Sequence, residues 1–127
     1  MLTDSPAFSG FSVNDLETAR RFYEETLGLR TSDAGMDGLM QLHLGGDTNV
    51  LVYAKADHTP ATYTVLNFPV EDVPGTVAEL RERGVPFERY EGTDVQTDDD
   101  YVFRGGGPLI AWFTDPGGNI LSIIAAS

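Results

Sequence analysis

Histidines are the residues of this sequence best suited to acid–base chemistry, and there are two of them. His43 lies in a segment of alternating apolar and polar residues, whereas His58 lies among loop residues. A histidine can act as a general base near neutral pH, but the spacing of residues shows no catalytic partner for either ring. We leave the catalytic residues unassigned, keep His43 either as the candidate base or as a polar residue that meets solvent, and expect His58 to be a solvent-exposed bystander.

Other reactive patterns are missing from the sequence. There is no cysteine, which excludes thiol catalysis, disulfides and thiolate metal sites. The consecutive carboxylates 98–100 cannot all converge on one ion, so they predict a solvated acidic turn. The glycines 105–107 are not followed by a lysine and a helix, as a phosphate-binding loop would be. Ser9 and Ser12 have no nucleophile-elbow motif around them.

Composition restricts the class of protein further. The chain has 127 residues, 41% of them hydrophobic, with 20 acidic against 8 basic side chains and a net charge of −12. This predicts one globular domain that repels phosphate backbones and anionic membranes, so we expect no nucleic-acid and no membrane partner. The first residues lack the basic and apolar regions of a signal peptide, and no apolar run is long enough to span a bilayer. We therefore expect a cytoplasmic protein.

An internal repeat organises the chain. Residues 11–16 reappear in kind at 68–73, an offset of 57 residues, and each copy is followed by an amphipathic, helix-like segment. Gly28 and Gly84 stand where a helix ends in a left-handed residue.

The sequence also predicts how each helix begins. Asn14 with Glu17 has the spacing of a capping box, and Asp72 can cap the second helix.

Strand-like segments follow each predicted helix. In order, they are expected at 29–33, 39–44, 49–54, 87–91, 109–114 and 120–125. The sequence thus predicts one domain, 1–127, with a first module at about 7–54, a linker at 55–62 and a second module at about 63–126. The irregular segment 92–108 breaks the symmetry and is either a functional loop or a solvated excursion.

These features together resemble the vicinal oxygen chelate superfamily of glyoxalases, bleomycin-resistance proteins and extradiol dioxygenases. The resemblance is carried by 13–16 leading to 22–29, by the repeat at 70–72, and by the turn 115–119 before a last apolar strand. It implies an α+β fold in which two βαβββ modules form curved mixed sheets around a shared cavity, often across a dimer interface. A homodimer is therefore expected.

The resemblance also implies where a divalent ion would be held. The first ligand position of each module falls on Phe8 and Val65, the last-strand position falls on Ser122, and the remaining position falls near Val52. Phenyl and isopropyl groups have no lone pair to donate, and a lone serine is a poor ligand. We expect no metal and no cofactor, which argues against glyoxalase and extradiol dioxygenase chemistry.

Strand alternation predicts which residues face the cavity. Gly10 and Ser12 share the face of Phe8, and Asn67 and Pro69 share that of Val65. Residues Ile120 and Ile124 share the face of Ser122.

The two hairpins extend this set of cavity residues. A three-residue loop at 116–118 places Trp112 opposite Ser122 and Ile110 opposite Ile124, whereas a four-residue loop would turn Ala111 and Phe113 inward. A tight turn at 46–47 pairs His43 with Val50 and Gln41 with Val52. The other face of that hairpin then carries Met40, Leu42, Leu44, Leu51 and Tyr53.

The end of the long segment adds one more group of candidates. Tyr101, Phe103 and Arg104 could form a lid or an anchor for a polar ligand. Alternatively, Tyr101 and Phe103 continue a strand and Arg104 pairs with a nearby carboxylate.

The sequence predicts a protein that binds small molecules without a metal ion and sequesters a drug or natural product. The negative net charge favours cationic or neutral ligands over anionic ones. The alternatives are a cofactor-free isomerase or lyase, and an interaction module whose cavity is filled by Phe8 and Trp112. The expected ligand-binding residues are Phe8, Ser12, Gln41, His43, Val52, Val65, Asn67, Tyr101, Arg104, Trp112 and Ser122.

Overall fold

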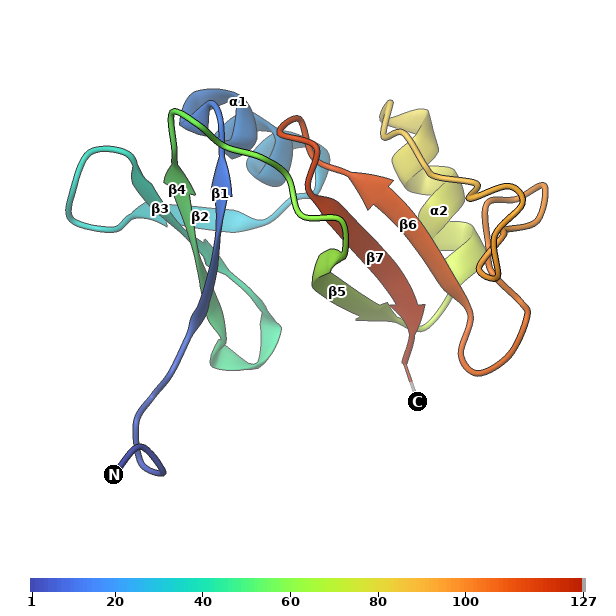
Figure 1. The fold of residues 1–127 in the computed structure, drawn as a ribbon, viewed down its shortest axis with the longest axis horizontal. Coiled ribbons are helices and arrows are strands. Elements are labelled where there is room, and N and C mark those ends of the chain that lie inside the picture. The colour runs from blue at the N-terminus through green and yellow to red at the C-terminus, as the bar shows by residue number, and fades with distance from the viewer. Residues whose placement is uncertain (127) are drawn as a thin grey trace. The chain divides into compact units, whose positions relative to one another are not determined.

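The fold is α+β, as predicted. The computed structural model describes residues 1–126, and Ser127 lies outside the described part. The chain divides into two compact units, Met1–Thr59 and Pro60–Ser127, and each unit carries its own sheet with its own helix packed against it (Figure 1). None of the helices within residues 1–126 has the length and apolar character needed to cross a bilayer.

The first unit has the predicted βαβββ order. Its sheet runs β1-β4-β3-β2, with β1 parallel to β4 and the other neighbours antiparallel. Its elements are β1 (Ser9–Val13), α1 (Leu16–Arg21), the π-helical turn η1 (Phe22–Thr26), β2 (Arg30–Asp33), β3 (Leu39–His43), the 3₁₀ turn η2 (Gly45–Asp47) and β4 (Asn49–Ala54).

Helix α1 begins one residue later than the predicted capping box would place it. Asp15 is the N-cap, and its Oδ1 accepts hydrogen bonds from the backbone N–H groups of Glu17 at 3.1 Å and Thr18 at 3.3 Å. The Asn14–Glu17 capping box is therefore wrong, because the neighbouring aspartate satisfies the free N–H groups instead. The helical segment ends as predicted at Gly28, which has a left-handed φ of 75°.

The sheet of the first unit has one buried face. Helix α1 packs on the face that carries Met40, Leu42, Val50 and Val52. Because the strands alternate, these apolar side chains all face the helix, and their burial is the main contribution of the strands to the stability of the folded unit. The core of the unit consists of Phe11, Val13, Ala19, Tyr23, Met40, Leu42, Val50 and Val52.

The first hairpin has a different register from the predicted one. Gly46 and Asp47 both have positive φ, and Leu44 N–H donates to Thr48 O, so the loop holds three residues rather than two. His43 then pairs with Asn49 and Met40 with Val52. A one-residue shift moves every side chain of a strand to the other face.

That shift corrects two predicted sets of residues. Val52 is completely buried on the α1 side, so it was wrong as a cavity residue. Leu51 and Tyr53 lie on the opposite face, which was expected to carry Val50 and Val52. Gln41 and His43 lie on the face away from α1, as predicted.

The second unit repeats this plan with one strand reduced. Its sheet runs β5-β7-β6, with β5 parallel to β7 and β6 antiparallel to it. The strand expected at 87–91 is wrong as a strand, since only an isolated bridge between Phe87 and Phe113 forms there. The elements are β5 (Thr64–Val70), α2 (Val73–Glu82), β6 (Ile110–Thr114) and β7 (Ile120–Ala125).

Helix α2 begins and ends where the sequence predicts. Asp72 is the N-cap and accepts a hydrogen bond from Gly75 N–H at 3.0 Å, and Gly84 has a φ of 86°. Against the sheet it buries an apolar stripe of Val73, Val77 and Leu80.

The last hairpin has the predicted three-residue loop. Asp115 N–H donates to Asn119 O at 3.0 Å, and Gly118, with a φ of 86°, donates its N–H to Asp115 O. Asn119 also donates its backbone N–H and its amide Nδ2 to the Asp115 carboxylate. Trp112 consequently pairs with Ser122, and the alternative with Ala111 and Phe113 on that face does not occur. Both of these side chains are completely buried on the α2 side.

Replacing Phe113 by alanine should lower the free energy of unfolding by about 3–5 kcal/mol. The Phe113 ring is fully buried and packs on Phe87 with ring centroids 5.4 Å apart, so its removal leaves a cavity. Urea unfolding measures the effect, and Phe113→Leu should cost less. The same deletion at Phe8, which is 72% exposed, serves as the control and should leave the unfolding midpoint nearly unchanged. Equal losses at the two positions would contradict this assignment of the core.

Candidate functional site

Each sheet has a second face that points away from its helix, and we call this its open face. The open face of the first unit carries polar and aromatic side chains beside few large apolar ones. They are Gly10, Ser12, Arg30, Ser32, Leu39, Gln41, His43, Asn49, Leu51 and Tyr53.

The open face of the second unit is marked by an aromatic cluster. Trp112 lies with its ring centroid 5.3 Å from that of Tyr90 in an edge-on arrangement and 6.0 Å from that of Phe103. All three side chains are half-buried. We call Tyr90, Phe103 and Trp112 the aromatic cluster. Trp112 was predicted at this site, whereas Tyr90 comes from a loop whose path the sequence pattern does not reveal.

Tyr90 is held in an uncommon backbone conformation. Its φ is 52°, and a bulky side chain rarely adopts a left-handed conformation unless its surroundings hold it there. Partial burial raises the pKa of its phenol, and the negative charge of Glu88 raises it further. Glu88 N–H donates to Trp112 O at 2.8 Å, which ties this loop to β6. The phenol is therefore neutral at physiological pH.

Ser122 and Asn67 lie side by side next to Trp112. They pair across β5 and β7, and Ser122 Oγ–H donates to Asn67 Oδ1 at 2.6 Å. The serine is completely buried and the asparagine is exposed. Val65 is half-buried at an irregularity of the β5–β7 register. The Asn67 amide is thus the group of this pair that a ligand in solvent can reach.

The positions assigned to metal ligands by the resemblance do not fit a metal ion. Val52 and Val65 present carbon atoms only, Val52 on the wrong face, and Phe8 presents a phenyl ring. The Ser122 hydroxyl hydrogen is already directed at Asn67. Within residues 1–126, no three His, Cys, Asp or Glu side chains gather where they could hold an ion together.

The long segment 92–108 is organised around Asp98. Its Oδ1 accepts the N–H groups of Asp100 and Val102, and its Oδ2 accepts Arg104 Nε–H at 2.6 Å. Partial burial opposes ionisation, but the hydrogen bonds from Val102, Arg104 and Asp100 outweigh it and lower the pKa of this carboxyl. Thr97 and Val102, which belong to this segment, are both buried.

The contacts of this loop bear on both interpretations of its candidates. Arg104 pairs with the Asp98 carboxylate, as the alternative stated. Tyr101 does not continue a strand, because its φ is 67°. Phe103 forms a β-bridge with Ile110. Tyr101 lies beneath Arg81, whose guanidinium carbon is 4.3 Å from the ring centroid, with Arg89 at 5.2 Å.

Phe8 and Gln41 line a cavity of about 350 Å³ in the first unit. Its volume falls within the range of small-molecule sites. The remaining lining residues are Pro6, Ala7, Asp47, Thr48, Asn49 and Leu51.

Both histidines have serine partners that the sequence did not reveal. Ser12 Oγ lies 2.7 Å from His58 Nδ1, so His58 is a half-buried partner of a candidate residue and not the bystander expected. Ser32 Oγ lies 2.7 Å from His43 Nε2, and His43 Nδ1 lies 3.1 Å from Asn49 Oδ1. These contacts depend on strand pairing, which spacing along the chain does not show.

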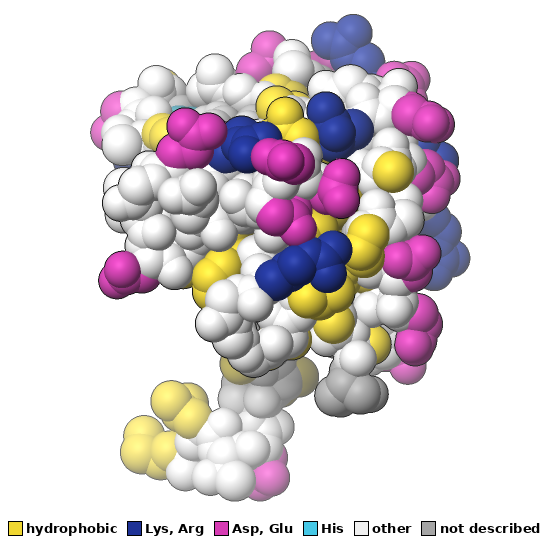
Figure 2. Space-filling view, turned by 90° about the vertical axis from the view of Figure 1, so that its right-hand side faces the viewer, with side chains coloured by type: hydrophobic (Ala, Val, Ile, Leu, Met, Phe, Trp, Pro, Cys, Tyr) yellow, Lys and Arg dark blue, Asp and Glu magenta, His cyan; other side chains and the backbone are white. Residues whose placement is uncertain are grey.

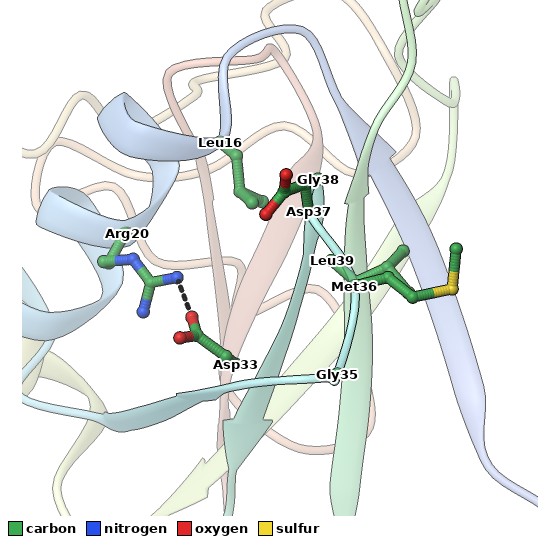
Figure 3. Close-up of a pocket in the computed structure, with 8 residues that line it drawn as sticks. All are labelled: Leu16, Arg20, Asp33, Gly35, Met36, Asp37, Gly38 and Leu39. Atoms are coloured by element: carbon green, nitrogen blue, oxygen red, sulfur yellow. Dashed lines mark hydrogen bonds and ion pairs between the residues drawn. The ribbon is translucent and has the colours of Figure 1, made fainter.

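A larger cavity of about 670 Å³ lies on the α1 side of the first sheet. It is formed by Leu16 and Arg20 of α1 and by Asp33 and residues 35–39. Arg20 Nη2 donates to Asp33 Oδ1 across it at 3.0 Å (Figure 3). Met36 points away from this ion pair. The cavity lies outside the open face, and its one cationic group, Arg20, is already paired with Asp33, so we do not assign it as the site.

Charges of both signs share the surface. On the face shown in Figure 2, acidic side chains are spread out with lysine and arginine side chains among them. With a net charge of −12, the average field still favours cationic over anionic molecules.

A family model and similar solved structures both point to one superfamily. The model of the Glyoxalase/Bleomycin resistance protein/Dioxygenase superfamily matches residues 7–123. TnmS3, an antibiotic binding protein from Streptomyces sp. CB03234, is 26% identical with a TM-score of 0.66, covering 98% of this chain and 99% of that one. A glyoxalase/bleomycin resistance protein from the same strain is 27% identical with a TM-score of 0.61, covering 93% and 99%.

A third solved structure shares the fold at lower identity. It is a superfamily member from Sphaerobacter thermophilus DSM 20745, 21% identical with a TM-score of 0.66, covering 94% of this chain and 97% of that one. No curated protein sequence matches the chain.

Replacing Asp98 by alanine should loosen the segment that carries Tyr101 and Arg104. The amide of Val102 loses its acceptor, so its hydrogen exchange should accelerate by about tenfold or more, as for a lost hydrogen bond of about 1.5 kcal/mol. Exchange measured by mass spectrometry or NMR reports this, with Asp100→Ala, outside these side-chain bonds, as the control.

The acid dependence of this loop has a definite sign. Because the pKa of Asp98 is lowered on folding, its contribution to stability is present above the ordinary value of 3.8 and is lost as pH falls through the lower folded value. NMR signals of Val102 and Arg104 should therefore stay constant from pH 7 to about pH 4.5. A transition of these signals above pH 5 would contradict the assigned contacts.

Proposed function

The chain belongs to the glyoxalase/bleomycin resistance protein/dioxygenase superfamily, and we propose that it binds a small aromatic molecule without a metal ion, sequestering a drug or natural product. The observation that carries this proposal is the aromatic cluster on the open face of the second unit. Trp112 offers a large, half-buried apolar ring where a flat molecule can pack.

The geometry of the cluster suits an inserted ring. Tyr90 meets Trp112 edge-on, at an interplanar angle of 66°, so the two rings form a corner rather than a closed stack. Aromatic pairs in tilted or offset arrangements add about 0.5–1.5 kcal/mol beyond the burial of their area. The strained backbone of Tyr90 supports the proposal, because such strain persists where the surrounding structure enforces a position.

Polar groups beside the cluster limit the orientation of a ligand. The exposed Asn67 amide can donate through its nitrogen while its oxygen accepts from Ser122. Sites of this kind combine apolar walls with a few placed polar groups. We propose Trp112, Tyr90 and Asn67 as the main contacts of the second unit.

The relatives support the kind of ligand. One similar structure is an antibiotic binding protein, and another is a glyoxalase/bleomycin resistance protein. Together with the net charge of −12, this favours a flat antibiotic that carries an amino group.

The cavity lined by Phe8 and Gln41 argues against an interaction module with filled space. Phe8 is 72% exposed rather than inserted, and about 350 Å³ remains open beside it. We propose this cavity and the open-face residues Ser12 and His43 as a further ligand surface of the first unit. We also propose that the protein is a cytoplasmic homodimer, which sedimentation would show as a species of twice the chain mass.

Binding can be tested with daunorubicin, a flat antibiotic with an amino group, and with metal-free bleomycin. Trp112 is the only tryptophan, so quenching of its fluorescence reports on the cluster itself. We expect a Kd on the order of micromolar for at least one probe, unchanged by EDTA. Equilibrium dialysis should show about tenfold weaker binding by Trp112→Ala and a smaller loss by Trp112→Phe, because the latter keeps a ring.

Tyr63→Ala is the matched control, because Tyr63 is an aromatic residue of the same unit that is 69% exposed and outside the cluster. It should bind like the unchanged protein. Full binding by a folded Trp112→Ala variant, or binding that EDTA abolishes, would refute the proposal.

A further inference from the structure

We infer that Ser32, His43 and Asn49 form a nucleophilic serine site that hydrolyses small uncharged esters. The three residues lie on the open face of the first unit, whereas the aromatic cluster belongs to the second unit. The inference shares His43 and the first-unit cavity with the proposed ligand surface, but it is tested separately from the binding proposed at Trp112.

The hydrogen bonds fix the tautomer that this chemistry needs. Asn49 Oδ1 can only accept, so its contact of 3.1 Å with His43 Nδ1 places the imidazole proton on Nδ1. In the neutral ring, Nε2 then carries the lone pair. Ser32 Oγ lies 2.7 Å from Nε2, so its hydroxyl donates to that nitrogen. Two hydrogen bonds thus connect a serine to a base and the base to a group that orients it.

Strand register brings these residues together. His43 and Asn49 are paired residues of β3 and β4, and the three-residue loop between these strands is what makes them face each other. Ser32 on β2 is paired with Gln41, two residues before His43 on the same face. Two adjacent strand pairs hold the side chains, and Ser32 and His43 are both half-buried.

A cavity adjoins this line of residues. Asn49 and Gln41 both line the cavity of about 350 Å³, whose walls include the apolar side chains of Phe8 and Leu51. An acyl or aryl group of a small ester fits such a volume. Asp47 also lines it, so an anionic substrate is disfavoured.

Two polar side chains are cross-strand neighbours of Ser32 and His43. Gln41 is the cross-strand neighbour of Ser32 and carries an amide N–H₂ group. Arg30 is the cross-strand neighbour of His43 and carries a positive charge. Side-chain amides and guanidinium groups both stabilise an oxyanion.

The reaction would proceed in two balanced steps. Ser32 Oγ attacks the carbonyl carbon of the ester, its proton moves to His43 Nε2, and the leaving alcohol takes that proton as the carbon–oxygen bond breaks. Water then attacks the acyl-serine, passes a proton through the same nitrogen to Oγ, and releases the acid. Overall, ester and water give acid and alcohol.

A fluorophosphonate probe tests the first step directly. It forms an Oγ–phosphorus bond at an activated serine and expels fluoride, and intact-protein and peptide mass spectrometry locate the adduct. We expect one adduct, on Ser32, and hydrolysis of p-nitrophenyl acetate by the unmodified protein. Ser32→Ala should abolish the adduct, and His43→Ala should slow its formation by about 100-fold or more, with partial rescue by added imidazole.

Conservative and control variants separate this chemistry from a folding defect. Asn49→Asp keeps an acceptor oxygen and should keep labelling, whereas Asn49→Leu should reduce it. Ser9→Ala on β1 changes an exposed serine that pairs with Val50 rather than facing His43, and should have no effect. Labelling elsewhere, no labelling of the folded protein, or a rate independent of His43 would overturn the inference. None of these results would affect daunorubicin binding at Trp112.

Discussion

The burial of one face of each sheet under its own helix is the constraint on which the rest of the structure depends. In both units the strands alternate, so covering one face fixes which side chains remain on the other. Leu121, Phe113 and Ile123 are held against α2, and this leaves Trp112 and Ser122 on the open face. The candidate functional side chains are thus those that the strands place on the face opposite the core.

The length of each hairpin loop sets the strand register, and the register decides which side chains are buried under the helix. The loop 116–118 and the loop 45–47 each hold three residues, and each includes a glycine with positive φ. In the first hairpin, the three-residue loop places Asn49 rather than Val50 opposite His43. Had the turn contained one residue fewer, the histidine would face an aliphatic neighbour and would lack its orienting amide. The same local choice buries Val52.

Much of the fold could be predicted from the sequence because its strongest signals are local. The helix ends at Gly28 and Gly84, the Asp72 cap and the turn 115–119 depend on residues close to one another in the chain. Trp112 opposite Ser122 followed from the turn alone.

The parts that sequence patterns missed depend on competition or on distant contacts. Asp15 and Asn14 compete for the same cap, and spacing alone does not decide between them. Segment 87–91 has strand-like residues, but only Phe87 forms a bridge, and Tyr90 turns into a left-handed conformation toward Trp112. The partners of both histidines lie on other strands or loops.

The open faces carry polar side chains, although the positions that the resemblance assigns to metal ligands do not fit a metal ion. Where the superfamily resemblance assigns ligands, this chain has carbon side chains and a serine bonded to Asn67. Of these positions, Val52 is part of the buried face under α1 and is fixed by packing. Polar groups gather instead on the open face of the same sheet, as Ser32, His43 and Asn49 do. The proposed binding and the proposed hydrolysis therefore both depend on a few open-face side chains, while the helix-covered faces keep them in register.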